Sequence, residues 1–231
     1  MTGALLFYLG VRRLTEGDEL EAVGNGLELL RLEAALGLNV EAELQNLVIG
    51  ADWAITLFNW IYIWGHWPVL ASTFIWLFFR HRTEFVLFRN SLVISGLIGL
   101  VIFAIYPVAP PRLLEIGMVD TVAELSQAVH VMQPPSMVNK YAALPSFHVG
   151  WNFLVALAIF RAAPIRAVRL AALAGPAAMS ASVVLTANHY IVDGVVGIAI
   201  AYVAWMVAHR MPVPEPTVRE VEATREVVPI T

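Results

Sequence analysis

Apolar stretches separated by short charged or polar turns dominate this chain. Six of them are long enough, or nearly long enough, to cross a membrane: 44–64, 67–80, 90–107, 147–163, 168–187 and 189–209. A transmembrane helix needs about 20 apolar residues to cross a hydrocarbon core roughly 30 Å thick. The pattern therefore predicts an all-α, polytopic membrane protein with a core bundle of six transmembrane helices.

Composition agrees with a membrane location. Hydrophobic residues make up 59% of the chain and charged residues only 14%, which is too little polar surface for a soluble globule of 231 residues. The absence of cysteine excludes disulfide frameworks, thiolate metal sites and a cysteine nucleophile. No basic patch supports binding of nucleic acid, so membrane lipids are the expected surroundings.

Three regions are predicted along the chain. Residues 1–43 form an N-terminal amphipathic or interfacial region, 44–210 the six-helix domain, and 211–231 a flexible cytoplasmic tail. Residues 1–11 are apolar but too short to cross alone, so they are an interfacial anchor or part of an extra span. Residues 16–43 mix glutamates with leucines, which suits an amphipathic helix lying on the membrane and equally a solvated helical leader.

The arginines beside the predicted spans indicate an orientation. One side carries Arg80, Arg82, Arg89, Arg161, Arg166, Arg169 and Arg210. The other side carries only Arg112 and Lys140. By the positive-inside rule the arginine-rich side is cytoplasmic, so the loop 107–146 and the turn at 188 are extracytoplasmic.

Two short polar islands stand at the starts of apolar spans on that extracytoplasmic side. The first is Pro145–His148 and the second is Asn188–Asp193. An ionisable group at membrane depth costs about 2.5 kcal/mol or more, so such groups usually line a polar cavity or carry chemistry. His189 and Asp193 are four residues apart on a helix, which lets the carboxylate fix the imidazole tautomer and support a nucleophilic or basic ring.

The remaining polar residues of this side suit a phosphate group. Ser146 can cap the helix that carries His148, and the free N–H groups of a helix start attract anions. Arg112 stands at the outer end of the third span, and its guanidinium fork matches phosphate. Lys140 is the only lysine of the chain. Together these groups predict phosphoryl transfer through a phosphohistidine, with a phosphate ester or anhydride as substrate.

Three segments of the chain resemble the three motifs of the type-2 phosphatidic acid phosphatase superfamily. They are Pro110–Arg112, Ser146–His148 and His189–Asp193, in the superfamily's order, and the resemblance covers about residues 44–209. The Pro-Pro-Arg form of the first motif and the His-Tyr start of the third are nearest to the inositol phosphorylceramide synthase-like, or inositolphosphotransferase, branch.

The resemblance implies a role for each motif residue. His189 would be the nucleophile that forms the phosphoenzyme, Asp193 would orient it, and His148 would protonate the leaving group. Arg112 and Ser146 would hold the phosphate. It also implies that the reaction needs neither a metal nor another cofactor.

Three positions depart from the superfamily pattern. Phe147 stands where the usual glycine follows the motif serine, Ile105 where a lysine is usual, and Val183 where an arginine is usual. The predicted phosphate site is therefore short of two cations. Lys140 or His66 are candidates to supply the missing charge, and the alternative for His66 is an interfacial ring bonded to water.

The leading hypothesis is a metal-independent lipid phosphatase or phosphotransferase that acts on a lipid phosphate at the extracytoplasmic face. A metal-dependent membrane enzyme could instead use His148, His189 and Asp193 as ligands, although the neighbouring cations disfavour a bound cation. A transporter or a degenerate, non-catalytic relative is the third alternative.

Overall fold

The computed structural model describes residues 18–125 and 139–212, and all regular structure within them is helical. The all-α prediction is confirmed for these residues. The predicted anchor at 1–11 and nearly all of the predicted tail, from 213 onward, lie outside the described residues.

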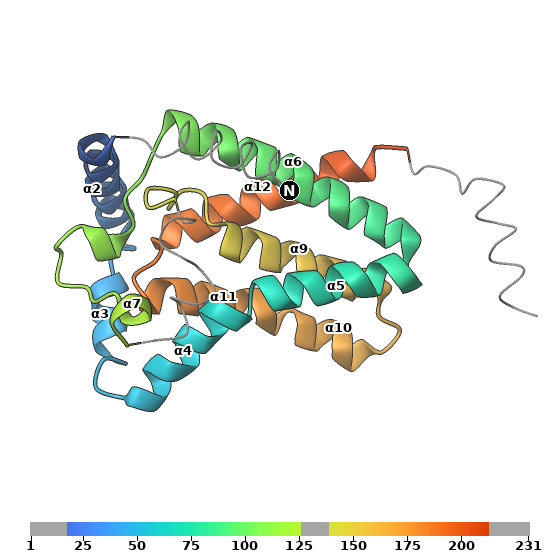
Figure 1. Cartoon of the computed structure of the whole chain (residues 1–231), viewed down its shortest axis with the longest axis horizontal. Coiled ribbons are helices and arrows are strands. Elements are labelled where there is room, and N and C mark those ends of the chain that lie inside the picture. The colour runs from blue at the N-terminus through green and yellow to red at the C-terminus, as the bar shows by residue number, and fades with distance from the viewer. Residues whose placement is uncertain (1–17, 126–138, 213–231) are drawn as a thin grey trace, which may run out of the picture.

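Ten α-helices and one 3-10 turn follow each other along the described residues (Figure 1). They are α2 (Glu19–Leu36), α3 (Glu41–Asn46), α4 (Asp52–Trp64), α5 (Trp67–Arg80), α6 (Arg82–Ile105), η1 (Pro111–Leu113), α7 (Thr121–Leu125), α9 (Phe147–Ala162), α10 (Arg166–Ala172), α11 (Ala174–Leu185) and α12 (Ile191–His209).

The prediction of six membrane spans is wrong for the described residues. Three helical segments are long and apolar enough to cross a membrane, namely α6, the continuous stretch Arg166–Leu185 and α12. The pair α4 and α5 passes the same test only when taken together, with a bend of 42° between the two helices, which gives at most four spans. The helix α9 has 16 residues, or about 24 Å at 1.5 Å per residue, and is too short for a hydrocarbon core of roughly 30 Å.

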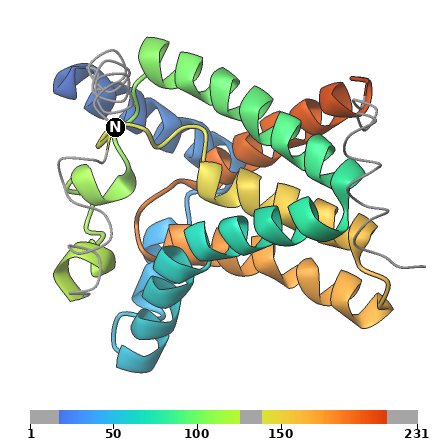
Figure 2. The same ribbon diagram turned by 45° about the vertical axis from the view of Figure 1, so that its right-hand side comes forward.

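The helix α9 runs through the middle of the bundle, surrounded by α5, α6, α10, α11 and α12 (Figures 1 and 2). Its residues Leu154 and Ala158 are completely buried, and the small residues Ala201 and Ala204 of α12 are buried too. Small residues let membrane helices approach closely, since packing rather than the hydrophobic effect holds helices together in lipid.

Two glycines set the closest approach between α9 and α12. A Cβ added at Gly150 would meet the carbonyl oxygen of Gly197 at 2.5 Å, and one added at Gly197 would run into the carbonyl oxygen of Ser146. Gly197 therefore serves the packing of α12 against α9. This approach brings the start of α9, which carries His148, beside the start of α12.

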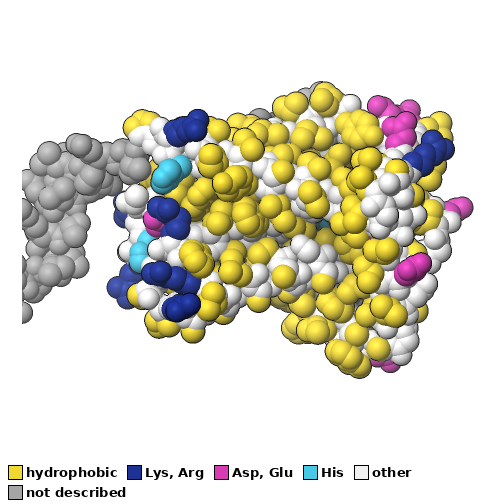
Figure 3. Space-filling view, turned by 180° about the vertical axis from the view of Figure 1, so that it is seen from behind, with side chains coloured by type: hydrophobic (Ala, Val, Ile, Leu, Met, Phe, Trp, Pro, Cys, Tyr) yellow, Lys and Arg dark blue, Asp and Glu magenta, His cyan; other side chains and the backbone are white. Residues whose placement is uncertain are grey.

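The surface divides into an apolar middle and two charged ends. On the face drawn in Figure 3, a broad hydrophobic band separates an end with mostly basic and histidine side chains from an end with mostly acidic ones. Strongly exposed apolar residues include Ile75, Phe79 and Val101, which are 57%, 74% and 59% exposed. Exposed apolar side chains in such number suit helices that face lipid. The helices α2 and α3 and the turn η1 lie at the end remote from the junctions α5–α6 and α9–α10 (Figure 1).

Candidate active site

The starts of α9 and α12 lie side by side and bring the two predicted histidines together. The backbone N–H of Ser146, just before α9, donates to the carbonyl oxygen of Asp193 in the first turn of α12, at 3.0 Å. The ring centroids of His148 and His189 are 5.8 Å apart. Residues separated by forty-one positions in the sequence thus face one site.

The ring of His189 is held through one nitrogen. Its Nδ1 lies 2.8 Å from the carbonyl oxygen of Ala143 and 3.3 Å from Oδ2 of Asp193. Both partners are acceptors, so Nδ1 carries the proton and Nε2 keeps its lone pair. The predicted contact between His189 and Asp193 is confirmed, and the carbonyl of Ala143 adds a second, shorter contact that fixes the same tautomer.

Asp193 is completely buried, and its carboxylate accepts hydrogen bonds from two groups. Its Oδ2 also accepts the backbone N–H of Tyr190 at 3.0 Å, three residues before it. This is the capping arrangement in which a side chain near the helix start bonds back to the residue before the helix. Orientation of the His189 ring and capping of α12 are therefore coupled through one carboxylate.

A tight turn carries the chain from α11 to His189. The N–H groups of Asn188 and His189 both donate to the carbonyl oxygen of Val183, at 2.9 and 3.1 Å. Ala187 adopts φ +57°, a left-handed conformation that is uncommon for residues other than glycine. The side chain of Val183 is 1% exposed, so the position where the superfamily has an arginine is filled by packed hydrocarbon.

His148 stands between two other rings. Tyr62 stacks on it with ring centroids 4.5 Å apart, and His66 lies 4.4 Å away on a tilted plane. Its Nε2 is buried and has no hydrogen-bond partner among the described residues. A buried polar atom without a partner costs about 1–3 kcal/mol. A bound ligand that hydrogen-bonds this nitrogen would remove that cost.

His66 is buried, with 2% of its surface exposed, at the break between α4 and α5. Nδ2 of Asn152 donates to the carbonyl oxygen of His148 at 2.8 Å and lies 3.3 Å from Nδ1 of His66. Since an amide nitrogen only donates, His66 Nδ1 accepts and the ring is neutral. The ring thus lies buried beside His148, with its centroid 4.4 Å from that of His148.

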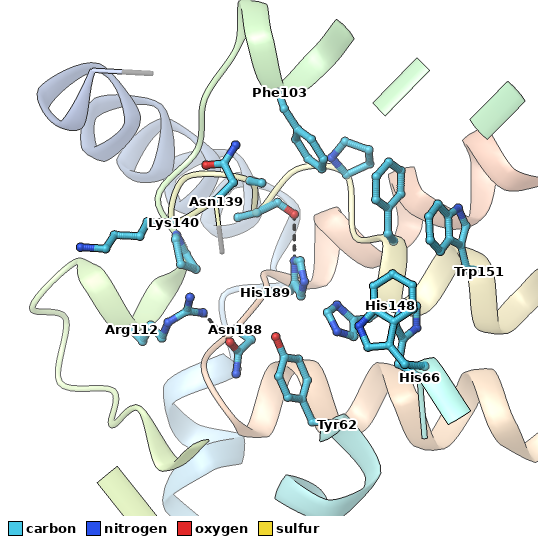
Figure 4. A pocket seen from close by; sticks show the side chains of 16 residues that line it. Tyr62, His66, Phe103, Arg112, Asn139, Lys140, His148, Trp151, Asn188 and His189 are labelled. Carbon is cyan, nitrogen blue, oxygen red and sulfur yellow. Dashed lines mark hydrogen bonds between the residues drawn. The ribbon is translucent and has the colours of Figure 1, made fainter. Parts of the chain in front are cut away.

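Arg112 lies in η1 and reaches the same site. Its Nη1 donates to Oδ1 of Asn188, and its Nε pairs with Asp120 at 3.1 Å. These contacts use two of its five N–H donors and leave three for a phosphate oxygen. Figure 4 shows the guanidinium directed toward His189, whereas the exposed side chain of Lys140 points away.

A cavity of about 440 Å³ joins these residues (Figure 4). Its lining divides into a polar and an aromatic part. The polar part holds Arg112, Asn139, Lys140 and Asn188. The aromatic part holds Tyr62, Trp67, Phe103, Phe147 and Trp151, and the histidines His66, His148 and His189 lie between the two parts. The remaining lining residues are Pro110, Ala142, Ala143 and Pro145.

Ser146 lies beneath this cavity and not on its wall. The side chain caps α9 as predicted, because its hydroxyl accepts the N–H of Val149 at 3.4 Å, and it is 0% exposed. Phe147 stands at the wall instead and stacks on Trp151, with centroids 4.7 Å apart.

Several site residues were not predicted from the sequence. Asn188, Asn152 and Asp120 position Arg112, His66 and His148. Asn188 carried a signal because it directly precedes His189 in the polar island. Tyr62 carried none, since it stands within a long apolar stretch.

The donors do not form a metal site. Among residues 18–125 and 139–212, no three histidine, aspartate or glutamate side chains converge to hold a metal ion. Nδ1 of His189 is occupied by Ala143 and Asp193, which draws the carboxylate away from His148. The alternative of a metal site built from His148, His189 and Asp193 gains no support from this geometry.

The site thus combines an oriented histidine–aspartate pair with a second histidine and an arginine, within a bundle of apolar helices. The sequence model of the PAP2 superfamily matches residues 27–207, and the chain belongs to this superfamily. Its members are generally phosphoric ester hydrolases. No curated protein and no solved structure matches the chain.

Proposed function

We propose that this membrane protein is a phosphatase or phosphotransferase that acts on a lipid phosphate through a phosphohistidine at His189. The observation that carries the proposal is the fixed tautomer of His189. Its Nδ1–H is held by the carbonyl of Ala143 and by Asp193, which leaves the Nε2 lone pair available for attack on phosphorus.

The reaction would proceed in two steps. In the first, Nε2 of His189 attacks phosphorus, the bond from phosphorus to the leaving oxygen breaks, and His148 gives a proton to that oxygen. In the second, water or an alcohol attacks the phosphohistidine, His148 takes the proton of the attacking oxygen, and the phosphorus–nitrogen bond breaks. Asp193 stabilises the charged imidazole, and Arg112 stabilises the negative charge on the phosphoryl oxygens.

The cavity supports a lipid as the donor. Arg112 and Asn188 stand at one part of its wall, where a phosphate would lie, and Trp67, Phe103 and Trp151 offer apolar surface at the other. The distribution of arginines supports an extracytoplasmic site. Arg80, Arg82 and Arg166 stand at the junctions α5–α6 and α9–α10, remote from the start of α12 (Figure 1). A lipid alcohol as acceptor would fit the inositolphosphotransferase-like branch, and water would make the protein a phosphatase.

Phosphate release tests the proposal. Purified protein in detergent is incubated with a panel of lipid phosphates in the presence of EDTA, with and without vanadate, and free phosphate is measured. An acceptor alcohol is added in parallel, and transfer of the phosphoryl group to it is measured. We expect release or transfer that EDTA leaves unchanged and vanadate blocks.

The matched control is His209, at the end of α12. His189→Ala should abolish activity, whereas His209→Ala, at an exposed position of α12, should leave it unchanged. Activity that disappears in EDTA, or that persists in His189→Ala, contradicts the phosphohistidine mechanism.

A further inference from the structure

Two glutamates from outside the core bundle reach the start of α12. Glu33 of α2 and Glu41 of α3 are 0% and 1% exposed. Oε1 of Glu33 accepts the N–H of Val192 at 2.8 Å, and Oε1 of Glu41 accepts the N–H of Ile191 at 3.3 Å. Figure 1 shows both helices at the end of the molecule where α12 begins.

With these two bonds, three consecutive backbone N–H groups at the start of α12 each have a carboxyl group as acceptor. The first N–H groups of a helix have no partner within it, and negative charge is favourable there. Asp193 takes the N–H of Tyr190, so residues 190, 191 and 192 each donate to a carboxyl group from a different helix. His189 is the residue directly before this set.

The two glutamates also face each other. Oε2 of each is buried and has no hydrogen-bond partner among the described residues. Two buried carboxylates that interact disfavour each other's charged form. Burial, together with the neighbouring Glu41, raises the pKa of Glu33 to about 8. Asp193 and Tyr190 are the other titratable groups that interact with this pair.

The packing of α2 against the bundle does not by itself explain why Glu33 and Glu41 are buried acids. The helix α2 already packs through Ala22 and Leu29, and through Gly26, where an added Cβ would meet the Tyr190 hydroxyl at 2.8 Å. Buried acids are unfavourable unless they hydrogen-bond, and both of these acids bond to the turn that follows His189.

We propose that Glu33 and Glu41 are positioning residues for His189: they hold the N–H groups of Val192 and Ile191 and thereby fix the first turn of α12, which sets the register of His189 and Asp193. This inference rests on the proposed function. It makes α2 and α3 part of the catalytic unit.

The kinetics of three variants and one control test the inference. Glu33→Ala leaves the N–H of Val192 without its acceptor, so we expect kcat to fall about tenfold or more while KM changes little. In Glu33→Gln the amide can accept from Val192 and donate to Glu41, so kcat near neutral pH should be kept. Glu41→Gln should behave in the same way. Glu43→Gln, at an exposed position of α3, is the matched control and should equal the wild type.

The pH profile separates positioning from a merely structural role. In the wild type, loss of the proton from Glu33 leaves a second negative charge beside the buried Glu41, so kcat should fall as pH rises through about 8. Glu33→Gln should lack this fall. If Glu33→Ala does not fold, as judged by thermal unfolding, the comparison of the wild type with Glu33→Gln decides.

The outcomes keep the two proposals apart. An active wild type whose kcat is unchanged in Glu33→Ala, or whose alkaline fall persists in Glu33→Gln, overturns the positioning role and leaves the proposed function intact. A wild type without phosphate release or transfer overturns the proposed function, and the positioning role with it.

Discussion

At the scale of single residues, the site depends on how two buried polar groups share partners. Nδ1 of His189 bonds Ala143 and Asp193, while Asp193 bonds both His189 and the backbone of Tyr190. The second histidine, His148, keeps a buried Nε2 without a partner among the described residues. These differences support the proposed roles of His189 as nucleophile and His148 as proton donor.

Replacement of Asp193 tests the orienting role. Asp193→Asn keeps an acceptor for Tyr190 but removes the charge that stabilises the imidazolium, so we expect kcat to fall about a hundredfold or more with little change in KM. Steady-state kinetics at saturating lipid phosphate, together with a thermal unfolding curve, measure this. A variant with wild-type kcat contradicts the role of Asp193.

Replacement of His148 tests the proton donor. His148→Ala should form the phosphoenzyme only from substrates with a good leaving group, such as an aryl phosphate, because that oxygen departs without a proton. Initial rates with an aryl and an alkyl phosphate are compared. An equal loss with both substrates contradicts the assignment.

Sequence spacing predicted the residue pair but not its surroundings. A separation of four on a helix places Asp193 beside His189 whatever the fold. The carbonyl of Ala143 is a backbone group forty-six residues away, and no side-chain pattern marks it. The neutral state of His66 depends on Asn152, which only tertiary packing brings there.

At the scale of helices, close contact between α9 and α12 sets the distance between the two histidines. Gly197→Ala would place a methyl group against the carbonyl oxygen of Ser146, so we expect a loss of about 1–3 kcal/mol in stability and a fall in kcat. Gly194→Ala on the same helix is the control, since its Cβ would lie 3.6 Å from Val149, an ordinary contact. Thermal unfolding and turnover of both variants are compared. Equal behaviour contradicts the packing role.

Burial of Glu33 predicts how stability depends on pH. The pKa of this carboxyl rises from 4.5 to about 8 in the folded protein, so between these values the folded state binds a proton that the unfolded state has lost. The contribution of Glu33 to the stability of the fold should therefore be fully present below pH 4.5, and it should be lost as pH rises toward 8. The difference in melting temperature between the wild type and Glu33→Gln, followed from pH 5 to 9, measures how this contribution depends on pH. A difference that does not change with pH contradicts it.

The prediction of helices from the sequence failed where the length of a helix, or the burial of a side chain, depends on neighbouring helices. Hydropathy separated the stretches 44–64 and 67–80 at the break near His66, but it did not show that α4 and α5 pass the test for a membrane span only together, with a 42° bend. Glu33 and Glu41 belong to an acidic pattern that predicts a solvated or interfacial face, yet both are buried. Their partners are backbone N–H groups about 150 residues away. No side chain at the start of a helix signals that its free N–H groups need such an acceptor.

At the scale of the whole molecule, the apolar helices and the PAP2 family suggest a membrane protein. The junctions α5–α6 and α9–α10, where arginines gather, lie at the end remote from the start of α12 (Figure 1). Composition alone predicted the membrane class. The orientation remains a prediction, checked by asking whether a membrane-impermeant reagent modifies a cysteine introduced at Lys140 in intact cells.

Detection of the phosphoenzyme tests the central claim most directly. The protein is mixed with a lipid phosphate labelled at phosphorus, quenched with detergent at alkaline pH, and examined for label bound to the chain. The account predicts a label that is stable in alkali and lost in acid, as expected for a phosphorus–nitrogen bond, present in His209→Ala and absent in His189→Ala. Label that persists in His189→Ala, or turnover of the wild type without any labelled protein, would contradict it.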